Sequence, residues 1–237
     1  MKRTLALIMV LASVLSLAAC GASKAEPSAE GSPLAQVVVF TDTVLEKMVR
    51  EAMNKPEGDI TLEEAEAVKE LKLGVEWQSP DEMRIKDISA LKYFKNLENL
   101  ELNFHAIKDI SPLAGLTKLR GLMLGGNEIS DISALSGLTE LGGLGLFNCT
   151  ATDYSPLKNL TKLRTLFIDY STFSDLSLLS AMTDLETLSF ANSQVSDLSP
   201  IAGFTKLKSL KLSGCPITDL SPLKAIYPSL TEKDFEM

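Results

Sequence analysis

Apolar and polar positions alternate over short stretches along most of this 237-residue chain. Aligning the sequence with itself at an offset of 22 gives six copies without a gap, covering residues 97–228. In each copy, positions 1, 4 and 6 are Leu, Ile or Phe. Side chains alternate between the faces of a strand, so positions 4 and 6 share one face and positions 3, 5 and 7 the other. Stacked copies of such a unit predict a solenoid with one strand per coil.

The second half of each copy predicts a turn and a short helix. Position 13 is always Asp and position 15 always Ser, as in DISPL (109–113). Serine can cap a helix through its hydroxyl, and proline suits the first helical position, so we expect a helical or 3-10 segment on the outer side of each coil. The aspartates would stack in a column that could either bind calcium or accept backbone N–H groups within the turn; we favour the turn. The column is Asp109, Asp131, Asp153, Asp175, Asp197 and Asp219.

Two copies, LRGLMLGGNEISDISALSGLTE (119–140) and LKSLKLSGCPITDLSPLKAI (207–226), resemble the bacterial internalin-like leucine-rich repeats. The resemblance implies an α/β solenoid: a leucine-rich repeat horseshoe with a parallel concave sheet and short 3-10 or helical convex segments. In that family, position 9 is usually Asn and belongs to a buried hydrogen-bond ladder. Only Asn127 matches here, so we expect a weaker ladder. The other five residues at this position are His105, Cys149, Ser171, Ser193 and Cys215.

Residues 36–70 precede the repeats and predict a helical N-terminal cap. Thr43-x-x-Glu46 and Thr61-x-x-Glu64 fit the capping box and open expected helices at 43–54 and 62–70. The hydrophobic core of the first coil of a solenoid must be covered, and we expect these helices to cover it. The repeat domain then occupies 71–237: an irregular first coil at 71–96, the six repeats at 97–228 and a terminal segment at 229–237.

The N-terminus has the pattern of an export signal. Lys2 and Arg3 precede the apolar run from Leu5 to Ala19, and LAAC (17–20) resembles the lipobox of bacterial lipoproteins. The resemblance implies a signal peptide at 1–19 and lipid attachment at Cys20. Residues 20–35 are rich in Ala, Ser, Pro and Gly, as expected of a flexible tether. We therefore expect an extracytoplasmic protein anchored by lipid to the bacterial cell membrane, or to the outer membrane in a host with two membranes.

Composition narrows the possible functions. The chain has 31 acidic against 23 basic residues and a formal net charge of −8, which argues against nucleic-acid binding. It has a single histidine, and no H-E-x-x-H, C-x-x-C or phosphate-loop motif. Cys149 and Cys215 lie three coils apart, which is too far for a disulfide. We expect free thiols, no metal, no cofactor and no enzymatic activity.

The middle repeats suggest a binding surface on the concave face. Counting from Leu141 places Gly143 and Gly145 at positions 3 and 5, where they would expose backbone beside large apolar side chains. Because apolar patches with charge at their edges are typical of protein-binding centres, we expect a protein partner here. The candidate binding residues are Met123, Gly143, Gly145, Phe147, Phe167, Asp169 and Tyr170.

The expected function is a monomeric scaffold that recognises a protein, or alternatively a glycan, through its concave face. One rival interpretation is a structural envelope lipoprotein without a specific concave ligand. Another is a hydrolase of cell-wall polymers, which would need two facing carboxylates in a cleft, a pair that the sequence does not indicate.

Overall fold

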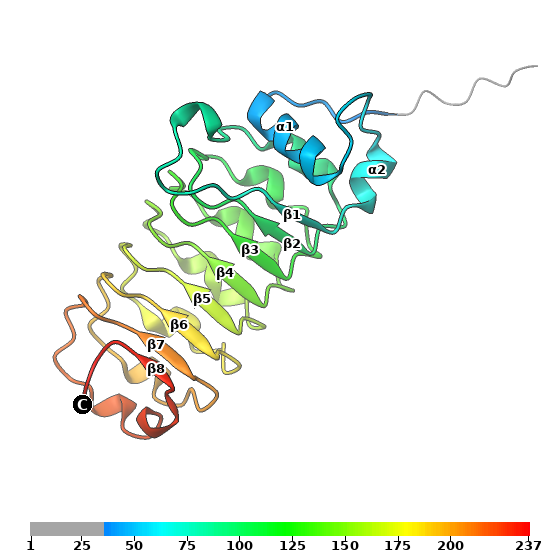
Figure 1. Cartoon of the computed structure of the whole chain (residues 1–237). Coiled ribbons are helices and arrows are strands. Elements are labelled where there is room, and N and C mark those ends of the chain that lie inside the picture. The colour runs from blue at the N-terminus through cyan, green and yellow to red at the C-terminus, as the bar shows by residue number, and fades with distance from the viewer. Residues whose placement is uncertain (1–35) are drawn as a thin grey trace, which may run out of the picture. The chain divides into compact units, whose positions relative to one another are not determined.

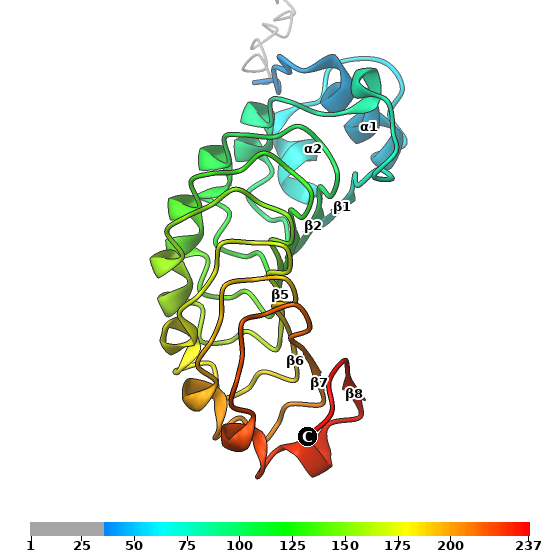
Figure 2. The same ribbon diagram turned by 90° about the vertical axis from the view of Figure 1, so that its left-hand side faces the viewer.

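Short parallel strands stack one per coil, in the order of the chain, into a single eight-stranded sheet (Figure 1). The structure, a computed structural model, describes residues 36–237. The strands are β1 (Glu70–Lys72), β2 (Asn99–Glu101), β3 (Gly121–Met123), β4 (Gly143–Gly145), β5 (Thr165–Phe167), β6 (Thr187–Ser189), β7 (Ser209–Lys211) and β8 (Glu232–Lys233). The sheet lies on the inner side of the coils, which confirms the expected solenoid architecture (Figure 2).

The register of the sheet follows the 22-residue repeat. Leu122 pairs with Leu144, which pairs with Leu166, and the leucines of neighbouring coils continue the same row. These side chains are buried, at 0–2% exposure, and they form one continuous core with the other repeat positions that face inward. Each buried leucine contributes about 1.5–3 kcal/mol relative to an exposed one, so a one-residue slip would be very costly. Positions 3, 5 and 7 therefore face the concave side, as the pattern predicts.

Short 3-10 segments follow the turns and lie on the outer side of the repeat coils (Figure 2). The nine segments within residues 36–237 are η1 (Asp81–Met83), η2 (Ser89–Tyr93), η3 (Ser111–Leu113), η4 (Ser133–Gly137), η5 (Ser155–Asn159), η6 (Leu176–Leu179), η7 (Ser199–Ile201), η8 (Ser221–Leu223) and η9 (Tyr227–Ser229).

The predicted serine cap is wrong, because the aspartate two residues earlier takes that role. Ser111 is the first residue of η3, and its N–H donates to Asp109 at 2.8 Å. The other five aspartates of the column accept the equivalent serine N–H, at 2.8–2.9 Å. In the second repeat, the Ser133 N–H holds the pKa of Asp131 below its ordinary value. The turn role predicted for this column is therefore formed in every repeat.

Two helices cover the N-terminal end of the solenoid. They are α1 (Thr43–Ala52), which buries Leu45 and Val49, and α2 (Leu62–Ala67). The capping box predicted at Thr61 is present, with reciprocal hydrogen bonds to Glu64. Both helices end before the expected residues. After α2 the backbone becomes extended at Val68 and enters β1, which pairs with β2, so sheet pairing overrides helix formation there.

Asp42, and not Thr43 as predicted, caps α1. One oxygen of its carboxylate accepts two N–H groups of the first helical turn, and the other accepts two from the first coil. The four donors are Val44, Leu45, Lys86 and Asp87, at 2.8–3.1 Å. This carboxylate therefore joins the helical cap to the repeats.

The C-terminal segment adds a last strand rather than a loop. The N–H groups of Thr231 and Glu232 donate to the Lys208 carbonyl, and β8 pairs with β7. The Asp234 carboxylate accepts the N–H groups of Leu212 and Ser213 at 2.9 and 3.1 Å. Backbone donors of the last complete coil are thereby satisfied.

The predicted signal peptide, the lipidated Cys20 and the tether lie outside the described residues. Within residues 36–237, no helix is long and apolar enough to cross a membrane.

Candidate functional site

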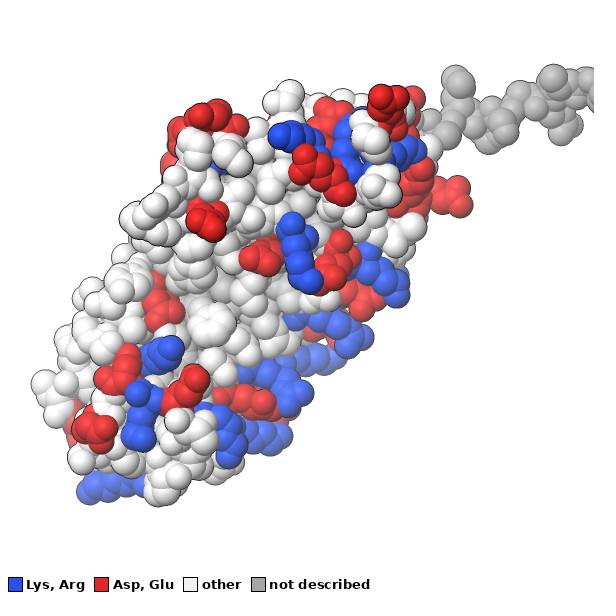
Figure 3. Space-filling view, viewed as in Figure 1, with Lys and Arg blue, Asp and Glu red and all other residues white. Residues whose placement is uncertain are grey.

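The middle strands bring the apolar candidates together on the concave face. Met123 pairs with Gly145, which pairs with Phe167, so these three residues form one row across β3, β4 and β5. The side chains of Met123, Phe147 and Phe167 are half-buried. Figure 3 shows that this face is largely uncharged over the middle coils. The site is therefore an apolar surface, and Met123 also lines a small hollow between it and β1.

Several glycines on this face lie under side chains from neighbouring coils. A Cβ at Gly125 would stand 2.1 Å from the Phe147 ring, and one at Gly126 would stand 2.4 Å from the Phe104 ring. The two rings meet above this glycine pair, with centroids 5.5 Å apart. The glycines thus create space in which two aromatic side chains from different coils can pack.

The candidate glycines of β4 differ from each other. Gly145 is buried, and a Cβ there would stand 2.8 Å from the Met123 sulfur, so its expected exposed backbone is covered. At Gly143 the nearest contact would be the Met123 methyl group at 3.7 Å, which is ordinary van der Waals distance. Gly143 therefore fits the expected open position, and Gly145 does not, because the flexible Met123 side chain folds over it.

A column of left-handed backbone follows the strands at position 8 of every repeat. Four members are Gly or Asn, which adopt positive φ most readily. The other two, Phe104 (φ 63°) and Tyr170 (φ 52°), are bulky and carry a cost of about 1–2 kcal/mol. The column is Phe104, Gly126, Asn148, Tyr170, Asn192 and Gly214.

Phe104 was missed by sequence reasoning, although the Gly and Asn residues at equivalent positions could have marked it as unusual. It is half-buried against Phe147, whereas Tyr170 is 64% exposed. Both aromatic side chains follow strands of the concave sheet on backbone that carries a conformational cost, and residues of this kind cluster at functional sites. Both therefore belong to the candidate surface.

Asp169 is bound within the protein. Its carboxylate accepts the Ser189 hydroxyl and, at 3.1 Å, the N–H of Ala191. In the first repeat, Asn103 occupies the same position and likewise accepts the Gly125 N–H, at 2.9 Å. Asp169 therefore holds adjacent coils together, and fewer of its lone pairs are free for a partner.

Trp77 is a second residue that sequence reasoning missed. It lies in a loop inserted between β1 and the first turn, and it is 67% exposed. The Arg84 guanidinium donates to the carbonyls of Trp77 and Ser79 at 2.8 and 3.0 Å, which fixes the loop. The loop leaves the sheet at the same strand ends as Phe104 and Tyr170, and it carries the chain's only tryptophan.

Comparison with known proteins agrees with this geometry. A family model described as leucine-rich repeats (two copies) matches residues 183–225. The crystal structure of an internalin (InlF) from Listeria monocytogenes superposes with a TM-score of 0.76 at 39% identity, over 84% of this chain and 58% of that one. Internalin C2 from the same species gives 0.65 at 27% identity, over 86% and 98%. The chain is an internalin-like leucine-rich repeat protein.

A third structure supports the fold alone. A leucine-rich repeat protein of Leptospira interrogans has a TM-score of 0.63 at 22% identity, over 73% of this chain and 44% of that one. This internalin-like chain spans little more than half the length of the InlF structure. No curated protein matches it in sequence.

The position-9 ladder of this internalin-like protein is built from unlike side chains. Asn127 makes three hydrogen bonds, of 2.8–3.1 Å, to backbone groups of Leu102, Leu124 and Ile107. Buried His105 accepts the N–H of Ile85 at 3.1 Å, and its other ring nitrogen lies 2.7 Å from the Leu73 carbonyl.

Burial lowers the pKa of His105, so the neutral ring fits this structural role. Cys149 makes one long contact of 3.7 Å to the Leu124 carbonyl, and burial raises its pKa to about 11. Cys149 and Cys215 are free thiols, as expected. The ladder is thinnest at Cys149, since Cys215 contacts both the Phe190 carbonyl and the Ser193 hydroxyl, at 3.1 and 3.3 Å.

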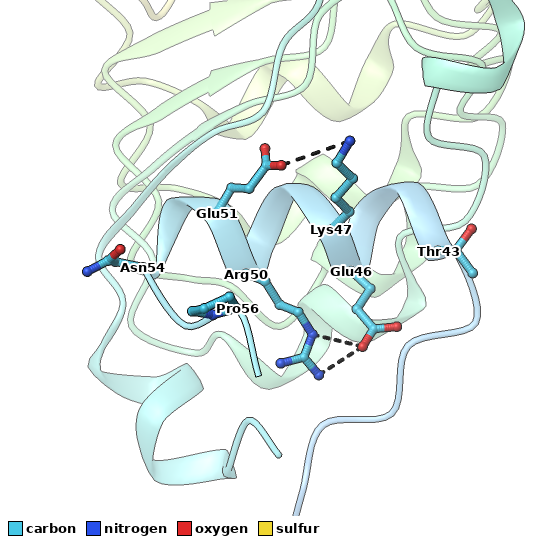
Figure 4. A pocket seen from close by; sticks show the side chains of 7 residues that line it. All are labelled: Thr43, Glu46, Lys47, Arg50, Glu51, Asn54 and Pro56. Carbon is cyan, nitrogen blue, oxygen red and sulfur yellow. Dashed lines mark hydrogen bonds and ion pairs between the residues drawn. The ribbon is translucent and has the colours of Figure 1, made fainter. Parts of the chain in front are cut away.

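Elsewhere, an open groove runs along α1 of this internalin-like protein (Figure 4). Both carboxylates that line it lie close to basic side chains four residues away: Glu46 pairs with Arg50 at 2.8 Å, and Glu51 with Lys47 at 4.0 Å. Such exposed pairs mainly support the helix. Among residues 36–237, no three His, Cys, Asp or Glu side chains are grouped to hold a metal.

Proposed function

We propose that this protein is a membrane-tethered extracytoplasmic scaffold that binds a protein partner through the apolar patch of its concave face. The patch consists of Phe104, Met123, Phe147, Phe167 and Tyr170. The proposal assigns no catalytic role to the chain, since binding by such a surface needs shape and apolar contact rather than titrating groups.

The observation that carries the proposal is the retention of aromatic residues where the backbone favours glycine or asparagine. If this surface had no binding role, the protein would be more stable with Asn in place of Tyr170, as at the same position of the flanking coils. The Tyr170 ring is instead 64% exposed, and half-buried Phe167 lies on the concave face of the same coil. Tyrosine is among the residues enriched in binding hot spots.

The tether is inferred from the sequence of residues 1–35, which lie outside the described part. A lipid on Cys20 would hold the domain near the membrane and raise its effective concentration toward a partner there. Incorporation of labelled palmitate into the chain, and its loss in Cys20→Ser, would test this part of the proposal.

The binding proposal is tested by a pull-down from envelope extract with residues 36–237, which contain the continuous core and both terminal caps. The variants are Phe147→Glu with Phe167→Glu, and separately Tyr170→Asn. The control Ala181→Glu places the same charge beside the outer segment η6. We expect a partner that the parent and the control retain and both patch variants lose.

The Tyr170→Asn variant makes the result interpretable, because it relieves backbone strain and should fold at least as well as the parent. Retention of the same partner by all variants would place binding elsewhere. Capture of nothing specific by the parent would favour the rival interpretation, a structural envelope protein.

A further inference from the structure

The edge of the sheet where the strands begin is charged, in contrast to the apolar patch. Residues one period apart form ion pairs along it: Lys162 with Glu140 at 2.6 Å, Lys206 with Asp184 at 2.5 Å, and Arg164 with Glu186. Figure 3 shows Lys and Arg side chains gathered along one edge of this face. Paired charges of this kind form a solvated border.

The pairing is incomplete beside the patch. Arg120 makes no ion pair within 4.0 Å among residues 36–237, although Glu98 and Glu140 lie near it around a shallow depression. Lys118 donates to the neutral amide of Asn96. From Lys118 to Arg164 this edge has four basic residues and one acidic residue, Glu140, on a chain of net charge −8.

This edge is also open between its two arginines. Gly142 occupies the coil between Arg120 and Arg164, which lie about 10 Å apart for a strand spacing of about 4.8 Å. A Cβ at Gly142 would meet only the Arg120 carbonyl, at 3.6 Å. The adjoining Gly143 is open as well, apart from Met123 at 3.7 Å. Apart from the Met123 methyl group, no side chain of the described residues lies within 4 Å of a Cβ at either glycine, and neither contact is as close as those at Gly125 and Gly145.

The geometry points to an acidic partner: a protein loop in which an Asp or Glu is next to an apolar side chain. The carboxylate would lie over Gly142 and pair with Arg120, and the apolar side chain would contact Met123 and Phe167. Arginine suits this role because its planar guanidinium can bind a carboxylate through two parallel hydrogen bonds. Glu186 already engages Arg164, so Arg120 is the principal contact. This inference rests on the proposed function and specifies its partner.

A random dodecapeptide library displayed on phage provides the probe. We expect peptides selected on residues 36–237 to be enriched in Asp or Glu adjacent to Leu, Met or an aromatic residue. The Arg120→Ser variant should weaken the selected peptides about tenfold, and Gly142→Leu should weaken them similarly by filling the space. Matched controls are Lys224→Ser, a cation lost after η8, and Gly203→Leu, at a glycine where a Cβ meets nothing within 4 Å.

The outcomes separate this inference from the proposed function. Selection of peptides without acidic enrichment, or equal affinity for Arg120→Ser and the parent, would overturn the acidic partner. If such peptides still require Phe147 and Phe167, the apolar binding face stands. If they require neither the arginine nor the aromatic residues, both proposals fail.

Discussion

At the scale of single residues, the column at position 8 contains aromatic residues that lower stability and that we assign to binding. Tyr170 and Asn148 share the same left-handed backbone in adjacent coils, yet only asparagine suits it. We predict that Tyr170→Asn raises the free energy of unfolding by about 1 kcal/mol, and that Asn148→Tyr lowers it by a similar amount. Urea denaturation followed by circular dichroism measures both. A destabilised Tyr170→Asn protein would show that the ring contributes more to packing than its strained backbone costs.

A second residue, Asp42, makes stability depend on pH. Burial raises its pKa, but the four backbone N–H donors outweigh this and hold the pKa below its ordinary value of 3.8. A carboxyl group with a lowered folded-state pKa stabilises the protein above its unfolded pKa, and this stabilisation is lost as pH falls through the folded value. We predict that Asp42→Asn costs about 1–2 kcal/mol at pH 7. Denaturation from pH 7 to pH 2 should show this difference shrinking below pH ~4, whereas a constant difference would contradict the ionic role.

Asp42 and the glycines also mark the limits of sequence reasoning at this scale. Both Asp42 and Thr43 are good capping residues, and the choice depends on amide groups of Lys86 and Asp87 more than forty residues away. Similarly, the sequence places Gly145 on the concave face but cannot show that Met123 folds over it. The repeat predicts which face of the sheet a residue lies on. The conformation of its side chain depends on neighbours in other coils, which the repeat does not predict.

At the scale of elements, the strands and turns were predictable because each recurs with the same spacing. The 22-residue period predicts the register of β2 to β7, so the row of Met123, Gly145 and Phe167 could be written from the sequence. The elements outside the period were harder to place. The helix expected over 62–70 ends at Ala67, and β8 forms where only a terminal segment was expected, since both depend on pairing with a neighbouring strand.

The packing between coils gives a prediction at the same scale. A methyl group at Gly125 would overlap the Phe147 ring, whereas one at Gly143 has room. We predict that Gly125→Ala destabilises the protein by about 1 kcal/mol, and that Phe147→Ala in the same chain removes most of this cost. The control Gly143→Ala should be neutral or stabilise by up to about 1 kcal/mol. A double-mutant cycle from denaturation curves measures the coupling, and additive effects would contradict the proposed contact.

At the scale of the whole molecule, stability is the sum of contacts between neighbouring coils, because each coil packs only against the next. The two ends are closed differently. At the N-terminal end, two helices and the Asp42 carboxylate cover the first coil. The C-terminal end has a shorter cover without an α-helix: β8 and the Asp234 carboxylate satisfy the backbone of β7 and the residues after it, and Phe235 packs against Tyr227. The C-terminal end is therefore the weaker one, and unfolding should begin there.

Removing residues 230–237 tests this asymmetry. The truncation takes away Asp234, which accepts the N–H groups of Leu212 and Ser213, and it exposes the edge of β7. In the truncated protein these two N–H groups no longer have the Asp234 carboxylate as acceptor. We predict that the amides of Leu212 and Ser213 then exchange with solvent more than tenfold faster, because no hydrogen bond to Asp234 has to break first. Amides of β2 and β3, five and four coils away, should keep their protection. Hydrogen exchange followed by NMR measures both sets. An equal loss of protection in β2 and β7 would contradict local opening and show that the repeats unfold as one cooperative unit.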